Sequence, residues 1–442
     1  MRALGMLREK LKVLLIIEQC NPEWASVPLE GFRYHAALSR LAEVTLVTHV
    51  RNQAALARAG VNGETIFIPE SRAGQFYGKL AGWLSEYHGH INWPVRHTLS
   101  YPAYAEFDGR VFHKLGEAVA RGSYDVVHVF TPILPRYPVR IVKACRNTPF
   151  ILGPVNGGLP FPAGFEDIAK KEFNQFNFLR GFARYIPGYS WTYQRADKIL
   201  AGSGATFRML RKIFAVTDDR FELLHENGVQ SEFFVDREPR LNHTIRLLFV
   251  GRLVSYKCAD LVIEAMNLLA PDIRRQATLT IVGDGPEREN LERLARNLGI
   301  AGQVTFAGWV PQERTLEFYR QSDVFCFPSV REFGGAVVLE AMAAGLPCIV
   351  ADYGGIAEYV TEGTGYRITL DSREHLRREL THHIEDLARD GELLAGMSAR
   401  AIERAREFTW DSKARRTVNI YETLIERKYA RNSPQLAERG ST

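Results

Sequence analysis

Short apolar runs alternate with longer amphipathic stretches along most of the chain, and most runs end near glycine, proline or asparagine. The first run, Lys12–Ile17, is followed by a helix expected from Gly31 to Leu41 and by a second strand at Val44–Val50. A strand, a helix and a strand in this order form a βαβ unit with parallel strands. The pattern therefore predicts a doubly wound α/β fold, whose ligands bind at the carboxyl ends of the strands.

The same alternation continues through the first half of the chain and starts again near residue 245. Further strands are expected at Tyr124–Thr131, Phe150–Gly158, Ala196–Ser203, Glu222–Val229, Ile245–Val250, Thr278–Gly283, Gln303–Phe306 and Val324–Phe327. A chain of 442 residues is too long for one ordinary core, so two domains are expected. We predict an N-terminal Rossmann-like domain at 1–235 and a C-terminal one at 236–407. A closing helix over Phe408–Arg427 and a polar tail make up 408–442.

Two segments of the first half interrupt this alternation. Residues 70–107 and Phe161–Tyr193 interleave Phe, Trp and Tyr with Lys, Arg and His. Such helices can lie at a membrane surface, line an acceptor site with sugar-stacking rings, or pack on the core of their own domain. The sequence leaves these three interpretations open.

The net charge of +5 is unevenly distributed. Residues 1–240 carry 30 Lys and Arg against 23 Asp and Glu, a balance of +7, whereas the remainder carries 26 against 28, a balance of −2. A basic first half favours an anionic partner, either membrane phospholipid or a nucleotide, although solvated surface charge gives the same balance. No element gathers enough Lys and Arg to predict a nucleic-acid partner.

The composition is that of a globular protein, with 46% hydrophobic and 24% charged residues. No apolar run approaches the length of a membrane-spanning helix. The five cysteines are scattered without a CxxC spacing, which favours a reducing compartment and argues against a zinc site. We therefore expect a cytoplasmic protein, and hypothesise a peripheral contact with the inner face of the plasma membrane.

The richest stretch chemically runs from Phe327 to Val360. Glu332 precedes a Gly334-Gly335 turn, and Glu340 follows about one turn inside the next expected helix. Glycines bring bare N–H groups close to a ligand, and a helix N-terminus attracts phosphate. Two carboxylates on either side of an anion site would hydrogen-bond the hydroxyl groups flanking a diphosphate, as in a nucleotide sugar.

Other candidate residues lie where strands are expected to end. Arg252 and Lys257 share one strand-to-helix loop, where two cations can clamp a diphosphate. In the first half, Gly31 would let backbone approach a phosphate, His128 lies within a strand, and Asn156 lies in a glycine-rich exit. A turn glycine and a core histidine remain alternative interpretations for Gly31 and His128.

The motifs of the second half occur together and in order. They are GRL-x3-K at Gly251–Lys257, GDGPE at Gly283–Glu287, PSxxE at Pro328–Glu332, EAMAAGLP at Glu340–Pro347 and GGIAE at Gly354–Glu358. In this order and spacing the chain resembles glycosyltransferase family 4, the group 1 retaining glycosyltransferases of GT-B fold. The resemblance spans nearly the whole chain, and the terminal FTWD with its helix resembles the family segment that returns to the first domain.

The resemblance implies a role for each matching residue. Arg252 and Lys257 would hold the donor diphosphate, Glu340 the ribose, and Glu332 the transferred sugar near its reacting carbon. The donor site would also include Gly334, Gly335, Gly283, Trp309 and Val310, the last two flanking the base. Such enzymes retain anomeric configuration and need no metal or other cofactor, which agrees with the absence of a D-x-D triplet.

Four positions depart from the family pattern, one of them being Phe333, which stands one place earlier than in many members so that Gly334 takes the expected Phe position. Phe130 replaces the second histidine of the usual H-x-H, so His128 is the remaining catalytic candidate on that strand. Gly31 is followed by Phe32 where a second glycine is usual, and Cys258 stands where a glycine normally follows the lysine. If the missing histidine matters, Asn156 or His35 would have to replace it.

We therefore predict a retaining glycosyltransferase that moves a sugar from a UDP- or GDP-sugar to a hydroxyl acceptor. The acceptor is expected to be a saccharide or lipid-linked saccharide in cell-surface polysaccharide or glycolipid assembly. A sugar-nucleotide epimerase on the same fold and a catalytically degenerate nucleotide-sugar-binding subunit are the alternatives.

Overall fold

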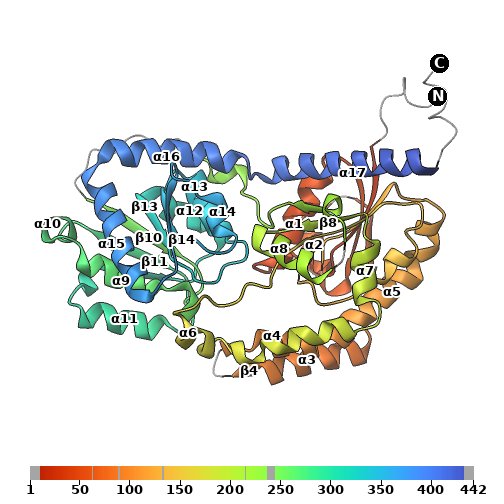
Figure 1. The fold of residues 1–442 in the computed structure, drawn as a ribbon, viewed down its shortest axis with the longest axis horizontal. Coiled ribbons are helices and arrows are strands. Elements are labelled where there is room, and N and C mark those ends of the chain that lie inside the picture. Colours follow the sequence, from red (N-terminus) through yellow and green to blue (C-terminus); the bar gives the residue numbers. More distant parts are fainter. Residues whose placement is uncertain are drawn as a thin grey trace, which may run out of the picture.

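A computed structural model describes residues 10–432 except 62, 88–89, 132–133, 215 and 236–243. Two parallel sheets lie at the two ends of an elongated molecule (Figure 1). We call the part that carries the seven-stranded sheet the N-terminal unit, and the part that carries the six-stranded sheet the C-terminal unit. Two parallel sheets with helices between the strands confirm the predicted doubly wound α/β class.

The sheet of the N-terminal unit has the order β3-β2-β1-β6-β7-β8-β9. Its strands are β1 (Lys12–Ile16), β2 (Glu43–His49), β3 (Thr65–Ile68), β6 (Val126–Val129), β7 (Phe150–Val155), β8 (Lys198–Ala201) and β9 (Phe221–Leu223). Its regular crossovers include α1 (Val27–Leu38), α2 (Gln53–Arg58) and α8 (Gly204–Ile213). The central strands are apolar on both faces because helices cover both.

The sheet of the C-terminal unit has the order β12-β11-β10-β13-β14-β15. Its strands are β10 (Arg246–Val250), β11 (Thr278–Val282), β12 (Val304–Gly308), β13 (Val324–Phe327), β14 (Cys348–Ala351) and β15 (Gly365–Ile368). Its helices are α9 (Ala259–Leu268), α10 (Pro271–Arg274), α11 (Arg288–Asn297), α12 (Gln312–Gln321), α13 (Ala336–Ala343), α14 (Ile356–Tyr359), α15 (Arg373–Arg389) and α16 (Gly391–Arg406). Strand order reverses between β10 and β13, which is where doubly wound sheets bind ligands.

The first helix begins earlier than the sequence predicts. It starts at Val27, because Pro28 suits the first turn of a helix, and Gly31 therefore lies inside α1. A Cβ on Gly31 would come within 2.8 Å of Ile17 Cγ2 and 3.3 Å of the Gln19 carbonyl oxygen. Gly31 thus lets α1 approach the end of β1, and the expectation that it opens the helix is wrong.

The two aromatic and basic segments form one helical layer on one side of the molecule (Figure 1). It consists of α3 (Arg72–Ser85), α4 (Trp93–Leu99), α5 (Tyr101–Ala120), α6 (Glu166–Lys171), the 3-10 segment η3 (Asn174–Tyr185) and α7 (Tyr189–Arg195), with the short hairpin β4 (Glu86–Tyr87) and β5 (His90–Ile91). Helix α4 contacts both α3 and η3. Within the described ranges, no helix is long and apolar enough to cross a membrane.

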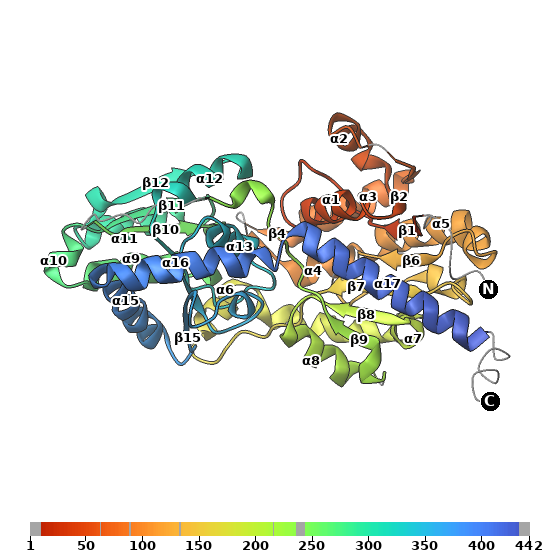
Figure 2. The same ribbon diagram turned by 90° about the horizontal axis from the view of Figure 1, so that it is seen from above.

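The segments around Val229 and Phe408, which lead into and out of the C-terminal unit, pair with each other. Val229 donates its N–H to the Phe408 carbonyl at 2.9 Å, and Trp410 donates to the Val229 carbonyl at 3.3 Å. Beyond this point α17 (Trp410–Asn432) runs back along the N-terminal unit, in line with α16 on the other unit (Figures 1 and 2). Tyr421 of α17 bonds to His128 of β6, so α17 is part of the N-terminal core.

Candidate active site

Lys257 and Glu332 form an ion pair at the carboxyl ends of two neighbouring strands. Strands β10 and β13 pair in the sheet, so the loops that follow them emerge side by side. Lys257 Nζ lies 2.6 Å from Glu332 Oε2 and 4.7 Å from the ring centroid of Phe327, and only 13% and 16% of the two charged side chains are exposed. Burial alone would lower the pKa of Lys257, but Glu332 outweighs it and the pKa is raised.

The N-terminus of α13 lies beside this pair. Gly335 precedes the helix with a φ of 70°, and a Cβ placed on it would be 3.1 Å from Glu332 Cγ. With its amide oriented to satisfy both of its polar atoms, Asn227 accepts the N–H groups of Gly335 at 3.0 Å and Ala336 at 3.1 Å. The helix therefore starts at Ala336 as predicted, and Asn227 bonds amides that the sequence assigns to phosphate.

Glu340 lies one turn inside α13, where it is 4% exposed. Tyr319 donates its hydroxyl to Glu340 Oε2 at 3.0 Å, and Gln312 donates its amide to Glu340 Oε1. Gln312 in turn accepts from Arg33 Nη2 of the N-terminal unit at 2.8 Å. Burial raises the pKa of Glu340, although Arg33 and these two donors oppose that effect.

The other predicted donor residues surround this centre in different ways. Arg252 is exposed and has no ion pair among the described residues. Its positive charge lowers the pKa of Lys257. Trp309 follows β12 and is 73% exposed, whereas Val310 packs against the core. Gly283 lies so close to Gly251 that a side chain at position 283 would collide with the Gly251 carbonyl oxygen. Close packing of the backbone therefore explains why a glycine occupies this position.

His128 does not have the geometry of a catalytic base. It is fully buried, its Nδ1 lies 2.5 Å from the Tyr421 hydroxyl, and its Nε2 lies 2.7 Å from the Gly153 carbonyl oxygen. Burial lowers its pKa to about 4, so the ring is neutral at pH 7. In this structure His128 belongs to the core, where Phe130 is also fully buried, and its catalytic role stays a prediction.

Asn156 is likewise occupied within the N-terminal unit. It is 1% exposed, its Nδ2 donates to Glu226 Oε2 at 2.6 Å, and its Oδ1 accepts from Ser203 and Thr206. Its assignment to the binding site stays a prediction. The bonded amide gives Asn156 a structural role in holding Glu226.

Sequence analysis missed the residues that complete the site from distant segments. Arg33 and Gln312 are 279 positions apart, and Asn227 and Tyr319 stand in no recognisable motif. A third unpredicted group lies between the units: Glu30 and Glu226 are buried beside Lys413 of α17, whose Nζ donates to the Glu226 carbonyl. Burial raises the pKa of Glu30 to about 8 and lowers that of Lys413 to about 7.

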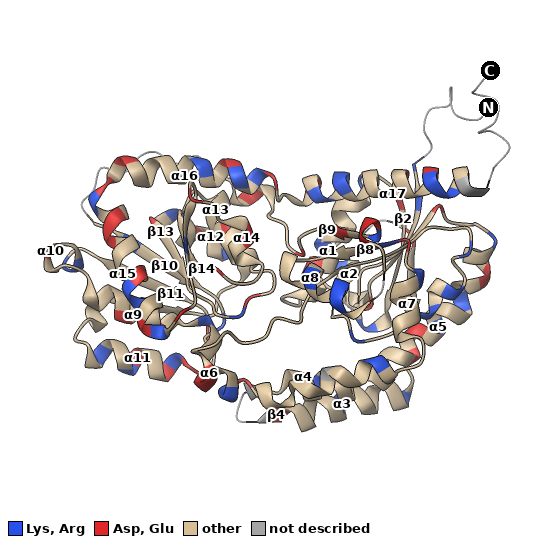
Figure 3. Cartoon of the chain, in the orientation of Figure 1, with Lys and Arg blue, Asp and Glu red and all other residues tan. Residues whose placement is uncertain are grey.

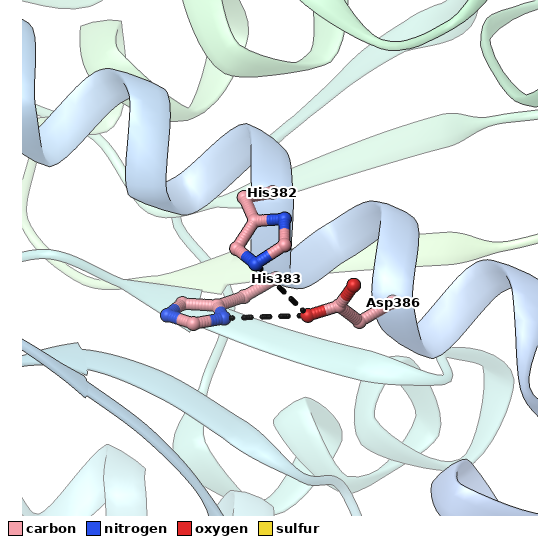
Figure 4. Close-up of side chains that lie close together, drawn as sticks. All are labelled: His382, His383 and Asp386. Carbon is pink, nitrogen blue, oxygen red and sulfur yellow. Dashed lines mark ion pairs between the residues drawn. The ribbon is translucent and has the colours of Figure 1, made fainter.

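One group of side chains in the described part of the chain has metal-ligand geometry. His382 Nε2 and His383 Nδ1 lie 3.5 and 3.7 Å from Asp386 Oδ2 on α15 (Figure 4). The three residues belong to one surface helix, and His382 is 61% exposed. The carboxylate already pairs with both rings, and none of the predicted site residues lies on α15.

Known proteins resemble this chain in sequence and in fold. A family model described as glycosyl transferases group 1 matches residues 232–408. Relatives named D-inositol 3-phosphate glycosyltransferase from Streptomyces scabiei and Catenulispora acidiphila are 30% and 34% identical over 258 residues. These matches cover 54% of this chain and 56% and 59% of the relatives, so the chain spans little more than half their length.

Solved structures match over most of the chain. They include WaaG, a glycosyltransferase involved in lipopolysaccharide biosynthesis, with a TM-score of 0.57 and 18% identity over 92% of this chain and 99% of that chain. Anabaena HepE, solved with UDP and glucose, has a TM-score of 0.56 and 16% identity over 93% of this chain and 100% of that chain. A glycosyltransferase from Rickettsia africae has a TM-score of 0.62 and 14% identity over 95% and 99%. These likenesses confirm the predicted GT-B fold.

Proposed function

Because the chain belongs, through residues 232–408, to the group 1 glycosyl transferases, we propose that it is a retaining, metal-independent hexosyltransferase. It moves a sugar from a UDP- or GDP-sugar to a hydroxyl acceptor. The observation that carries the proposal is the buried Lys257–Glu332 pair beside the N-terminus of α13. A cation and backbone amides at one point suit a diphosphate, and an adjacent carboxylate suits a sugar hydroxyl.

In this proposal the protein stabilises the departing nucleoside diphosphate. That group gains negative charge as its bond to the sugar breaks, so fixed positive groups accelerate the reaction. Lys257, Arg252 and the N–H groups at Gly334 and Gly335 supply the positive charge without a metal. Because Asn227 accepts from Gly335, the diphosphate displaces the Asn227 side chain when it binds.

Two further donor contacts follow from the family resemblance. Glu340 binds the ribose and therefore exchanges its bond to Gln312 for a bond to a ribose hydroxyl. Glu332 contacts the transferred sugar near its reacting carbon, while Trp309 and Val310 flank the base. Closure of the two units around the donor excludes water and favours transfer over hydrolysis.

The donor proposal is tested by thermal-shift screening against UDP, GDP, ADP and their sugar conjugates. One nucleotide should stabilise the wild-type protein, and Lys257→Ala should lose that shift. Lys198→Ala is the matched control, because Lys198 is also 13% exposed and paired with a glutamate, Glu222, but lies in the N-terminal sheet. A folded protein that no nucleotide stabilises would refute the donor site.

Activity is tested with the nucleotide that binds. Incubation of its sugar conjugate with a mixture of polyhydroxyl acceptors should transfer the sugar with the anomeric configuration kept, as read by NMR. The relatives' name makes D-inositol 3-phosphate one compound to include in that mixture. Conversion of the sugar nucleotide without any acceptor would favour the epimerase instead.

We further propose that the acceptor is assembled into cell-surface polysaccharide or glycolipid, and that the helical layer of the N-terminal unit rests on an anionic membrane. The layer exposes large aromatic side chains: Phe76 62%, Trp83 76%, Phe178 64%, Phe182 54% and Tyr185 66%. Lys and Arg positions occur along the same layer (Figure 3), and Arg184 stacks on Tyr185 at 4.8 Å. Aromatic rings flanked by cations suit the headgroup region.

Liposome flotation tests this contact. Vesicles that contain phosphatidylglycerol should bind the wild-type protein in a salt-sensitive way, and the triple variant Trp83→Ser, Phe178→Ser, Phe182→Ser should lose most of that binding. Tyr429→Ser is the control, because Tyr429 of α17 is 68% exposed outside the layer. Equal binding by both variants would remove the membrane from the proposal.

A further inference from the structure

The side chain of Asn227 occupies the point at which the donor diphosphate is proposed to bind. Its oxygen accepts the N–H groups of Gly335 at 3.0 Å and Ala336 at 3.1 Å, and only 6% of the residue is exposed. A Cβ placed on Gly334 would lie 3.1 Å from Asn227 Cγ, so this side chain and the Gly-Gly turn are in close contact. A phosphate oxygen and the Asn227 oxygen therefore compete for one position.

The residue before Asn227 is held by the N-terminal unit. Asn156 donates its Nδ2 to Glu226 Oε2 at 2.6 Å, and Lys413 of α17 donates its Nζ to the Glu226 carbonyl. Glu226 is 8% exposed, so both bonds are shielded from water. The N-terminal unit therefore presents Asn227 to α13 of the C-terminal unit.

The residues on either side of Glu226 and Asn227 are also fixed. A Cβ placed on Gly228 would lie 2.8 Å from Trp410 Cδ2, so this backbone packs directly on the indole. On the other side, His225 Nε2 lies 2.9 Å from Glu358 Oε2 of α14. Because the backbone is held at both ends, the Asn227 side chain can leave α13 by rotating, without separation of the two units.

Exchange of Asn227 for a phosphate favours the phosphate only in part. Hydrogen bonds to a charged acceptor are roughly twice as strong as those to a neutral one, and a helix N-terminus further stabilises an anion. The two N–H groups already have an acceptor in the free protein, however, so a diphosphate gains only the difference between the two kinds of bond. Asn227 therefore weakens the binding of a diphosphate to α13.

The same exchange assists departure of the diphosphate. A buried N–H group that loses its acceptor is costly, and this cost opposes release of any ligand that such a group holds. When Asn227 returns to Gly335 and Ala336, it removes that cost. A weaker complex and an easier release are two consequences of one side chain.

We propose that Asn227 is an internal competitor for the donor diphosphate, which lowers donor affinity and refills the site as the nucleoside diphosphate leaves. Asn227 thus determines how tightly the protein holds its donor and its product. The inference rests on the proposed function in taking the ligand at α13 to be the donor diphosphate.

The first experiment measures binding of inorganic pyrophosphate by isothermal titration, which needs no knowledge of base or sugar. Asn227→Ala should bind pyrophosphate about fivefold more tightly than the wild type, although it is less stable to heat because α13 loses its capping bonds. Asn227→Asp should bind about tenfold more weakly or worse, because a negative charge then stands where the anion binds. A purely structural role predicts weaker binding by the less stable Asn227→Ala.

Two controls locate the effect. Asn92 caps α4 by accepting the Val95 N–H at 3.2 Å, so Asn92→Ala should lose thermal stability while pyrophosphate affinity is unchanged. Lys257→Gln should weaken pyrophosphate binding both alone and combined with Asn227→Ala, because Lys257 lies beside the same N-terminus. Circular dichroism establishes that each variant is folded before affinities are compared.

The outcomes separate this inference from the proposed function. If a nucleotide binds but Asn227→Ala holds pyrophosphate no more tightly than the wild type, the inference is wrong and the donor site stands. If pyrophosphate affinity follows the expected order while no nucleotide binds, the competition stands and the donor assignment fails. If no variant binds pyrophosphate or a nucleotide, both are refuted.

A second experiment tests release of the product. During turnover of the sugar nucleotide that binds, Asn227→Ala should be inhibited by the corresponding nucleoside diphosphate at about one fifth of the wild-type concentration, in line with its tighter binding. Asn92→Ala should be inhibited as the wild type is. Unchanged inhibition of Asn227→Ala, together with tighter pyrophosphate binding, would overturn the role of Asn227 in release.

Discussion

The ion pair between Lys257 and Glu332 should be strongly coupled, because both partners are largely withdrawn from water. At the observed 2.6 Å, Coulomb attraction at an effective dielectric constant of about 20 is roughly 6 kcal/mol. Desolvation of both ions cancels part of this, so the net value of the pair is much smaller. Removing one partner leaves the other charged and buried, which costs about 3–5 kcal/mol.

A double-mutant cycle measures this coupling. Lys257→Met and Glu332→Gln are each compared with the wild type and with the double variant by urea denaturation followed by circular dichroism. Each single variant should be markedly less stable, and the double variant should recover at least about 2 kcal/mol relative to their sum. The control cycle uses Arg58 and Glu23, which lie 2.7 Å apart but are 63% and 47% exposed. Its coupling should stay below about 1 kcal/mol because water solvates both side chains.

Additivity of the two single variants within about 0.5 kcal/mol would refute this reasoning. In that case, packing against Phe327 would hold Lys257 in place, and the interaction with Lys257 would not constrain Glu332 before a donor binds.

Three further predictions test other parts of the site. Burial raises the pKa of Glu30 from 4.5 to about 8, so the folded state keeps a proton that the unfolded chain loses. The free energy of unfolding should therefore fall as pH rises between those values, and Glu30→Gln should flatten its pH profile in urea titrations. His128→Gln should lower the free energy of unfolding by about 1–3 kcal/mol, because the hydrogen bonds to Tyr421 and Gly153 are lost. Turnover by the folded variant should stay within a few-fold of the wild-type rate. A decrease in turnover beyond about a hundredfold would support His128 as a catalytic base. Gly335→Ala places a side chain at a φ of 70° and against a neighbouring residue. Nucleotide affinity, measured by titration, should therefore fall at least tenfold. Unchanged affinity would contradict the close approach of this backbone to the diphosphate.

The proximity of Lys257, Glu332 and the start of α13 was largely predictable from the sequence. Lys257 and Glu332 belong to motifs that directly follow apolar strands, and carboxyl ends of neighbouring parallel strands meet at one edge. Helix α13 begins where the Gly-Gly turn indicates, because Gly335 supplies the positive φ at its N-terminus. Local patterns suffice where the chain itself places the residues together.

The parts that the sequence did not predict depend on contacts between distant segments. Whether His128 faces a ligand or the core depends on Tyr421, which arrives on a helix 293 positions later. The bond from Arg33 to Gln312 likewise depends on how the two units meet. The start of α1 was missed for a local reason, because the proline at its first turn was overlooked beside Gly31.

The return of α17 to the N-terminal unit has a consequence for synthesis of the chain. Five residues of α17 complete a core cluster whose other members come from α1, α2, strands β1, β2, β6, β7 and β8, and the adjoining loops. They are Trp410, Ala414, Ile420, Tyr421 and Leu424. At translation rates of about 5–20 residues per second, α17 emerges roughly 10–40 s after the last strand of that sheet.

During this interval the C-terminal unit can assemble from contiguous chain, whereas the N-terminal unit exposes the apolar surface that α17 later covers. The unit that is synthesised first is therefore the one that finishes folding last. In the growing chain, chaperone binding and misassembly should occur mainly at the apolar surface that Tyr421 later covers.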